Sequence, residues 1–244
     1  MVSGCVHRPS GATGAQWSQA RQLVVVTVSD WNSTGGELRR FERQGEGWKQ
    51  VDGEAAVSIG RSGAAWGAGL HENPRDDAGP VKKEGDGRSP AGVFEIGEAF
   101  GYAATATTGL VYAPMHQTSW CIDVPGSPLY NRVVDSREVG EAAVQGSSEP
   151  MRRDLHLSGD PAYRVGFVVQ HNPARAPQAG SCIFVHQWKA PGAPTAGCTA
   201  LAADALDALL AWLDAKQRPV LVLLPRAQYE RLRGAWNLPE LASK

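Results

Sequence analysis

The stretch GSCIFVHQWKAPGAPTAGCTAL, residues 180–201, decides how this chain folds and what it does. Its first half, CIFVHQW, has the β-branched and aromatic side chains typical of a strand. Because side chains alternate between the two faces of a strand, Cys182, Phe184 and His186 share one face. A loop rich in proline and glycine then leads to Cys198. An apolar stretch follows at once, so we expect Cys198 to lie at the N-terminus of a helix.

That arrangement predicts an activated thiol. The unpaired N–H groups and the positive dipole end of a helix N-terminus favour thiolate, and His186 can take the thiol proton. The backbone N–H groups of Ala196, Gly197 and Cys198 could bind a developing oxyanion. Gly197 also removes side-chain bulk beside the sulfur, and Thr195 could hold the loop or donate a hydrogen bond. The alternative stays open that Cys198 and His186 only pack in the core.

The rest of the chain predicts a mainly β fold with a few helices. The 28 glycines and 16 prolines indicate many turns. Segments of strand length cover residues 21–29, 37–43, 54–60, 93–96, 164–172, 182–188 and 220–224, where 37–43 and 93–96 alternate apolar and polar residues. An amphipathic helix is expected between Cys198 and Pro219, with its apolar stripe formed by Leu206, Leu209, Leu210 and Leu213. A short helix is expected over 226–235, and long loops over 61–90 and 105–151.

Length and composition limit the class of protein. The 244 residues are 42% hydrophobic with a formal net charge of −1, which predicts a packed core and argues against nucleic-acid binding. No apolar run is long enough to cross a membrane. We expect a flexible tail over residues 1–20 and one domain over residues 21–244, acting as a monomer. The charged run KKEGDGR, residues 82–88, is interpreted as a solvated loop.

The four cysteines are too few for a disulfide scaffold. Cys121 and Cys182 could form a bridge in an oxidising compartment, but we favour two small buried hydrophobic residues. Near the N-terminus, VSGC resembles the lipobox at which bacterial lipoproteins are lipidated on cysteine. Two interpretations stay open: a trimmed signal peptide that leaves a lipid anchor at Cys5, or a chance match.

Residues 180–201 resemble the catalytic signature of the bacterial L,D-transpeptidases of the YkuD-like family, in which a histidine and a loop precede Ser/Thr-x-Gly-Cys. Upstream, GRSPAGVFEIG resembles the family's T-P-x-G-x-F segment. The matching positions there are Ser89, Pro90, Gly92 and Phe94. The stretches YNRVVD (130–135) and HNP (171–173) resemble a subgroup with long insertions, so the similarity spans about residues 22–225.

The resemblance implies a mainly β sandwich domain with a few helices and long loop insertions, acting on peptidoglycan stem peptides in the cell envelope, periplasmic or tethered to the outer membrane. Cys198 would attack the carbonyl of the diamino-acid residue in a donor peptide and release the terminal D-amino acid. His186 would be the base, while Thr195 and Gly197 match the signature. An amine of an acceptor stem peptide would resolve the thioester and form a cross-link. No cofactor is implied.

Two positions depart from the family pattern. Ala196 stands where many members have histidine, and Ala200 where many have asparagine or arginine. The loop between the histidine and the cysteine is also shorter than in much of the family. These departures bear on substrate contact and on the choice of acceptor.

Candidate substrate-binding residues are Ala196, His171, Asn172, Asn131 and Asp135. For Asn131 and Asp135 we favour turn capping over substrate contact. No H-E-x-x-H, H-x-H or C-x-x-C pattern supports a metal site. Two rival functions remain: an L,D-carboxypeptidase or amidase that uses the same Cys–His pair with water as acceptor, and a non-catalytic envelope-binding module.

Overall fold

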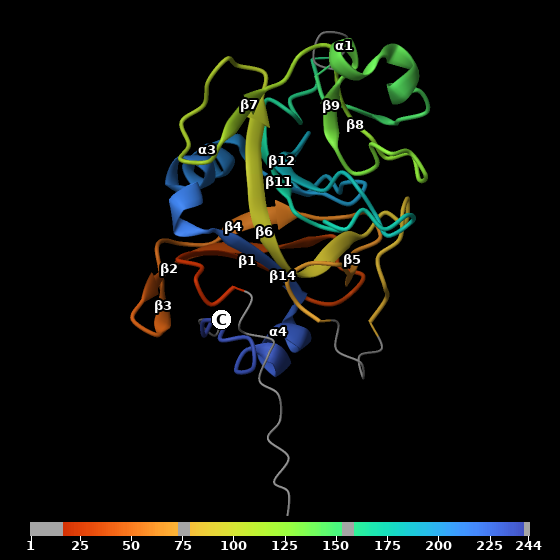
Figure 1. The fold of residues 1–244 in the computed structure, drawn as a ribbon. Helices are drawn as coiled ribbons and strands as arrows, with labels where there is room; N and C mark the ends of the chain where they lie inside the picture. The colour runs from red at the N-terminus through yellow and green to blue at the C-terminus, as the bar shows by residue number, and fades with distance from the viewer. Residues whose placement is uncertain (1–16, 73–78, 153–158, 242–244) are drawn as a thin grey trace, which may run out of the picture.

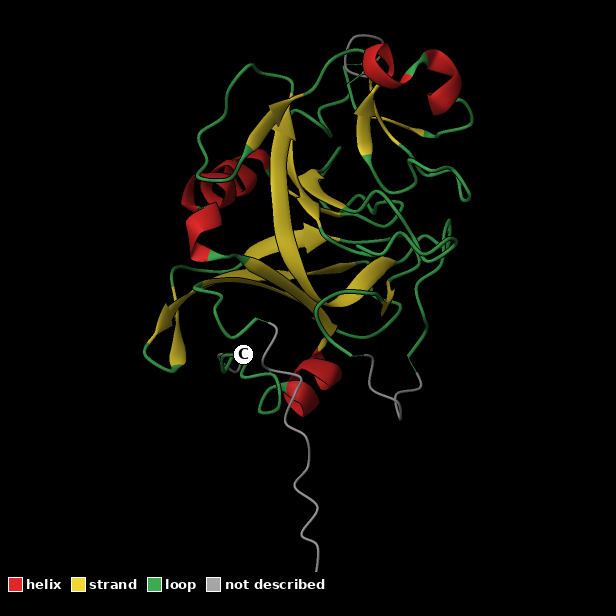
Figure 2. Cartoon of the chain, viewed as in Figure 1, coloured by secondary structure: helices red, strands yellow, loops and turns green. Residues whose placement is uncertain are grey.

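The fold is built mainly from strands (Figures 1 and 2). The computed structural model describes residues 17–72, 79–152 and 159–241. In chain order the strands are β1 (Gln22–Val28), β2 (Gly35–Gln44), β3 (Gly47–Gln50), β4 (Ala55–Ser58), β5 (Ala64–Trp66), β6 (Ser89–Gly101), β7 (Tyr112–Pro114), β8 (Ser119–Cys121), β9 (Val133–Asp135), β10 (Glu149–Pro150), β11 (Val165–Val169), β12 (Phe184–Gln187), β13 (Thr199–Leu201) and β14 (Val220–Pro225). The helices are α1 (Ser136–Val139), α3 (Ala203–Trp212) and α4 (Arg226–Leu232), with 3-10 turns η1 (Glu141–Val144) and η2 (Ala215–Gln217). The expectation of a mainly β chain is confirmed.

The main sheet closes on itself. Its strand order runs β1-β14-β6-β11-β12-β13-β4-β2, and β2 pairs again with β1. β1 therefore has two partners, β14 in parallel and β2 in antiparallel orientation. The resemblance implied two packed sheets, whereas these strands form one ring whose members all have neighbours on both sides. Closure satisfies the backbone groups that an open sheet would leave at its edges.

β1 is buried along its whole length, which explains its uninterrupted apolar run. One face of the strand lines the inside of the ring. The other is covered near the C-terminus, where α4 packs against β1 and β14 (Figure 1). Tyr229, Leu232 and Trp236 from this region belong to the same core cluster as the β1 valines. The short helix expected near the C-terminus is thereby confirmed.

A second, smaller core lies on the outer face of β11 and β12. Val165 and Phe167 of β11 point into the main core. Val168, the residue after Phe167, packs against the second cluster. Phe184 on β12 and Cys198 belong to that second cluster. Because side chains alternate along a strand, the two clusters lie on opposite faces of the same ring wall.

The outer core is covered by an insertion module, defined as residues 115–151. It carries the three-stranded sheet β10-β8-β9 and helix α1, which lie together at the upper right of Figure 1. Met115 and Met151, at the two ends of the module, are buried in the second cluster. The segments 61–90 and 105–151 were expected to be loops, yet they contain β5, β7 to β10 and α1. These strands have only two or three residues each, too short to show a period in the sequence.

The ordered core also begins earlier than expected. Trp17 and Ala20, which we assigned to the tail, are 6% and 2% exposed and pack in the main core. Trp17 lies edge-on to Trp236, with ring centroids 5.7 Å apart. Cys5, the candidate lipid anchor, lies outside the described residues.

Gly92 in β6 shows what the S-P-x-G-x-F segment requires. Its φ is +137°, and a Cβ built there would lie 1.8 Å from Cε1 of His71. His71 is held in place because its Nδ1 accepts a hydrogen bond of 3.0 Å from the amide of Val93. The next motif residue, Phe94, is fully buried in the main core. Glycine is therefore needed here for the close approach of His71 to the strand.

We expect Gly92→Ala to lower the free energy of unfolding by about 3 kcal/mol or more, because the new methyl group displaces the His71 ring and strains φ. Gly126→Ala is the matched control: Gly126 also has a positive φ, +91°, but nothing lies within 4 Å of its Cβ position. That control should lose only about 1 kcal/mol. Chemical denaturation measures both values, and equal losses would contradict the steric argument.

Candidate active site

Cys198 and His186 lie on the same outer face of two neighbouring strands. β12 and β13 are parallel, with Val185 opposite Thr199 and His186 opposite Ala200. Continuing this register places Cys198 beside Phe184, and alternation puts both on the face that carries His186. The amide of Phe184 donates a hydrogen bond of 3.3 Å to Cys198 Sγ. The structure therefore brings the two predicted catalytic side chains to one face.

The expected position of Cys198 at a helix N-terminus is wrong. β13 follows the cysteine directly, and α3 begins only at Ala203. The segment Thr199–Leu201 is held between β12 and β4, and its backbone pairs with both. These cross-strand hydrogen bonds override the helical pattern that begins downstream. The helix dipole consequently does not lower the pKa of the Cys198 thiol.

Two hydroxyl groups fix the backbone at Cys198. Ser89 Oγ and Thr195 Oγ1 both donate to the carbonyl of Cys198, over 2.9 and 2.6 Å. Ser89 Oγ also accepts from the amide of Gly60, and Thr195 Oγ1 accepts from the amide of Gly197. The prediction that Thr195 holds the loop is confirmed. Ser89 belongs to the upstream S-P-x-G-x-F segment, so this hydrogen bond joins two motifs that lie far apart in the sequence.

Gly197 is required by a close approach between two loops. A Cβ at this position would lie 3.1 Å from the carbonyl oxygen of Arg88. Its neighbour Ala196 is exposed, in contrast to the buried Cys198. Among the described residues, the amides of Ala196 and Cys198 donate no hydrogen bond, as a role in binding an anionic oxygen would require.

The thiol of Cys198 is protonated at neutral pH. The residue is only 8% exposed, and burial, reinforced by the negative charge of Glu149, raises its pKa to about 12. Sγ donates a hydrogen bond of 3.6 Å to the carbonyl of Cys182, a contact that also requires the proton. The cysteine at rest is therefore a neutral, buried thiol.

His186 is a neutral imidazole in this site. Burial lowers its pKa below the ordinary histidine value. Nδ1 lies 2.8 Å from the carbonyl of Gln187 and donates to it, so Nε2 carries the free lone pair. The ring of Tyr163 packs edge-on against it, with centroids 5.5 Å apart. Within the described ranges no hydrogen bond joins His186 to Cys198. A neutral base and a neutral thiol thus share one face without forming an ion pair.

His171 and Asn172, expected to contact substrate, support the framework instead. Both are buried, at 2% and 1% exposure. His171 Nδ1 accepts from the amide of Ala68, and its Nε2 lies 2.9 Å from the carbonyl of Ala179. Asn172 Nδ2 donates to the carbonyl of Gly180. A buried loop must satisfy its backbone polar groups, and these two side chains do so.

Asn131 and a disulfide fasten the insertion module to the ring. Asn131 Nδ2 donates to the carbonyls of His171 and Asn172, and Oδ1 accepts from the amide of Cys182. Cys121 in β8 forms a disulfide with Cys182, so our preference for two free cysteines is wrong. Neither substrate contact nor turn capping describes Asn131, which bridges two parts of the chain.

Asp135 caps a helix, as favoured from the sequence. Its side chain accepts from the amide of Arg137 at the start of α1, and its carboxylate pairs with the same arginine over 2.6 Å. The hydrogen bonds from Arg137 hold the pKa of Asp135 well below its usual range. Asp135 also lines a cavity of about 250 Å³ between β6 and the insertion module, so its side chain is still accessible from that cavity.

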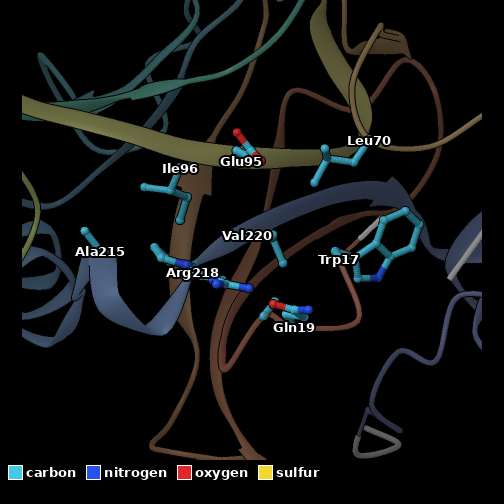
Figure 3. Close-up of a pocket in the computed structure, with 10 residues that line it drawn as sticks. Trp17, Gln19, Leu70, Glu95, Ile96, Ala215, Arg218 and Val220 are labelled. Carbon is cyan, nitrogen blue, oxygen red and sulfur yellow. The ribbon is translucent and has the colours of Figure 1, made fainter. Parts of the chain in front are cut away.

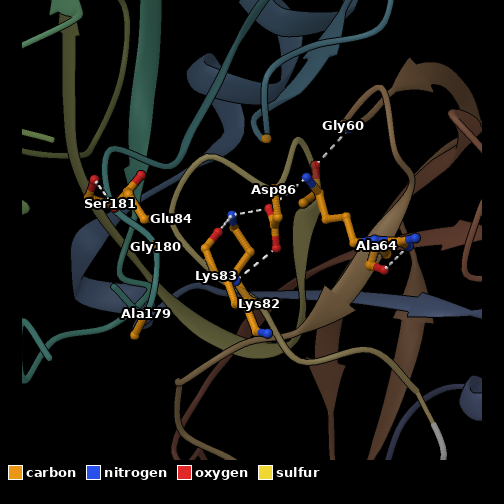
Figure 4. A network of polar contacts seen from close by, with 12 residues as sticks. Gly60, Ala64, Lys82, Lys83, Glu84, Asp86, Ala179, Gly180 and Ser181 are labelled. Carbon is orange, nitrogen blue, oxygen red and sulfur yellow. Dashed lines mark hydrogen bonds and ion pairs between the residues drawn. The ribbon is translucent and has the colours of Figure 1, made fainter. Parts of the chain in front are cut away.

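The loop at residues 82–88 is not simply solvated. Lys82 is 6% exposed, and its Nζ donates to Asp86 over 2.5 Å and to the carbonyl of Lys83 over 2.6 Å. Glu84 accepts from the hydroxyls of Tyr130 and Ser181. Figure 4 shows Lys82 and Asp86 turned toward each other and Glu84 beside Ser181. The charged run therefore joins the ring, the module and the loop before β12.

Sequence reasoning missed Tyr163 and Glu149. Tyr163 packs against His186 and also against Phe184 and Phe100. Its hydroxyl donates to the carboxylate of Glu149, the residue whose charge acts on Cys198. Tyr163 lies two residues before the start of β11, and an aromatic residue near a strand gives no signal of its own in a single sequence.

Comparisons with known proteins add little. No family model matches the chain, and no curated protein matches it. The fold is similar to the structure of Bd1075 from Bdellovibrio bacteriovorus, with 13% sequence identity and a TM-score of 0.41. That similarity covers 88% of this chain and 54% of the other, so the chain spans about half the length of that protein.

Neither a membrane-spanning helix nor a metal-binding group is found among the described residues. No helix there is both long and apolar enough to span a membrane. Nor do three or more His, Cys, Asp or Glu side chains gather there in a group that could hold a metal ion.

Cys198 should be alkylated very slowly in the folded protein. A pKa raised from 9.0 to about 12 reduces the thiolate fraction at pH 7 about a thousandfold. We expect iodoacetamide to label Cys198 at least that much more slowly in buffer than in denaturant, as measured by peptide mapping, which separates Cys198 from Cys5. Equal rates would show a thiolate already formed at rest.

His171 should make the protein less stable in acid. Burial, the largest cause, lowers the pKa of His171 from 6.5 to about 4, so between these values the unfolded chain binds a proton that the folded chain does not. The free energy of unfolding is therefore highest above pH 6.5 and falls by about 3 kcal/mol toward pH 4 from this residue alone. His171→Gln should flatten that slope in denaturant titrations. His116→Gln, at an exposed histidine, is the control, and an unchanged slope in His171→Gln would contradict the assignment.

Proposed function

We propose that this chain is a cysteine acyltransferase of the bacterial cell envelope that performs L,D-transpeptidation on peptidoglycan stem peptides. The observation that carries the proposal is the common face of Cys198 and His186 on the parallel strands β12 and β13. Its supports are the Ser/Thr-x-Gly-Cys signature ending at Cys198 and the hydrogen bond from Ser89, in the second motif, to the Cys198 carbonyl. On this proposal the domain is of the YkuD-like type.

The first half-reaction forms a thioester. His186 Nε2 takes the thiol proton while Sγ of Cys198 attacks the carbonyl of the diamino-acid residue in the donor peptide. The negative charge that develops on the carbonyl oxygen is taken by the amides of Ala196 and Cys198. As the tetrahedral intermediate collapses, the imidazolium returns the proton to the leaving amine. The terminal D-amino acid departs, and the acyl group stays on sulfur.

The second half-reaction restores the enzyme. The amine of an acceptor stem peptide attacks the thioester carbonyl and gives a proton to His186. The carbon–sulfur bond breaks, the sulfur regains a proton from the imidazolium, and an amide cross-link is released. Water in place of the amine would give the shortened donor peptide instead. The structure's neutral pair suits this cycle, because each half-reaction begins and ends with a neutral His186.

The disulfide supports the proposed location. Bonds such as Cys121–Cys182 form and persist in oxidising compartments, which include the bacterial periplasm. The cell envelope is also where stem peptides are found. A lipid anchor at Cys5 would keep the enzyme there, and it remains part of the proposal.

The catalytic pair can be tested with purified tetrapeptide muropeptides and mass analysis of the products. We expect Cys198→Ala to abolish turnover, since among the described residues Cys198 is the one free cysteine that could form the thioester. His186→Gln should lower kcat about 10²- to 10⁴-fold, the usual contribution of a general base. Cys5→Ala is the matched cysteine control and should retain full activity.

Each outcome of that assay has a distinct meaning. Dimers from the wild-type chain support transpeptidation, whereas shortened monomers alone would make water the acceptor and the enzyme a carboxypeptidase. Cross-linking by Cys198→Ala would overturn the mechanism. Binding of muropeptides by the wild type without any reaction would favour a non-catalytic envelope-binding module.

A further inference from the structure

A basic pocket that includes no residue of the Cys198 site lies at the start of the described chain. It has a volume of about 500 Å³, and its charged lining residues are Arg21, Arg43, Lys216 and Arg218. The other lining residues are Ser18, Gln19, Ala20 and Gly45, so no carboxylate takes part. For a chain with a net charge of −1, four cations around one cavity are a marked local excess.

Backbone hydrogen bonds assemble this pocket from three distant segments. The amide of Arg21 donates to the carbonyl of Gln217, and the amide of Arg43 donates to the carbonyl of Arg21, each over 2.8 Å. The end of β2, the start of β1 and the turn before β14 are thereby joined. Arg43 lies near the end of β2 and Arg21 directly before β1, while Lys216 lies in the turn η2 and Arg218 caps it, so these hydrogen bonds hold the backbone of the cation-bearing segments together.

The cations have no counter-ions of their own. In the part of the chain that the structure describes, none of the four forms an ion pair. Arg43 is oriented by stacking on Trp48, with its guanidinium carbon 4.9 Å from the ring centroid. Arg218 has a left-handed backbone, φ 49°, which is unfavourable for a side chain of this size. Like charges held together without neutralising carboxylates repel, so an anion that binds among them is stabilised.

A groove of similar volume, about 500 Å³, continues from the pocket and shares Arg218 with it. Figure 3 shows Arg218 pointing into this groove near Val220, with Trp17 on one side and Ile96 above. Glu95 also lines the groove, and it forms no ion pair with Arg218. The carboxylate disfavours an anion in the groove itself, so the negative group of a ligand is directed to the basic pocket.

We propose that the basic pocket binds a phosphoryl group and that, where this group is part of a larger ligand, the adjoining groove contacts the rest of that ligand. Guanidinium groups bind phosphate oxygens through paired hydrogen bonds, and three of the four cations are arginines. The phosphoryl group comes either from free phosphate or from the headgroup of an anionic phospholipid. Both present the same oxygens to the pocket. The site is separate from Cys198 and does not depend on the function proposed for that residue.

The full chain should be titrated with inorganic phosphate by calorimetry and sedimented with vesicles of phosphatidylcholine, with and without phosphatidylglycerol. The test variant is Lys216→Gln combined with Arg218→Gln, both at exposed positions, so the fold is retained. Arg132→Gln combined with Arg175→Gln, two exposed arginines that line neither the pocket nor the groove, is the charge-matched control. We expect the test variant to lose at least tenfold in affinity and the control to match the wild type. Muropeptide turnover should be the same in all three proteins.

The outcomes separate the two sources. Binding of inorganic phosphate with no binding to either vesicle type supports a free-phosphate site, and binding to phosphatidylglycerol vesicles but not to pure phosphatidylcholine vesicles supports a lipid headgroup, provided that the test variant is weakened in each case. Equal binding to both vesicle types overturns the proposal, because it does not depend on an anionic headgroup. No binding to either probe overturns the proposal. Equal loss in the test variant and the control also overturns it, because attraction would then follow net charge and not this pocket.

Discussion

The parallel pairing of β12 with β13 is the constraint on which the rest of the site depends. It sets Cys198 beside Phe184 and keeps His186 on the same face. Parallel neighbours need a crossover connection, and here that connection is the Pro- and Gly-rich loop ending in the signature. The same pairing requires the chain to stay extended after the cysteine. The strand that positions Cys198 therefore also takes the place of the helix N-terminus that was expected to lower the pKa of its thiol.

Most of the ring could be predicted from the sequence, because its long strands carry strong apolar runs. β1, β2, β11, β12 and β14 all fall where the pattern indicates. The strand β13 could not be predicted, since three residues beside a strong helical stripe have no period of their own. The closure of the sheet into a ring could not be predicted from the sequence either. It depends on which strands meet in space, and β1 pairs with partners from opposite ends of the chain.

The residues of the candidate site also fall into two groups, those whose role could be predicted from the sequence and those whose role could not. Cys198, His186, Thr195 and Gly197 could be found because the signature places them close together in sequence. The polar residues proposed to bind substrate were identified by type alone, and three of them, His171, Asn172 and Asn131, satisfy backbone groups of a buried loop. Residue type alone does not distinguish a side chain that binds substrate from one that satisfies the backbone of a buried loop, because both roles require amide and imidazole groups. Burial decides between them, and a single sequence does not give it.

The buried state of Cys198 has a consequence for the integrity of the protein itself. Cys121, Cys182 and Cys198 lie in the same small cluster, and the thiol hydrogen-bonds to the carbonyl of Cys182. A thiolate so close to a disulfide is a ready attacker, and exchange would release Cys121 and loosen the module from the ring. Only the deprotonated sulfur attacks, so the raised pKa of Cys198 keeps the native linkage from scrambling. The buried, protonated state of Cys198 thus protects the covalent linkage between the insertion module and the ring.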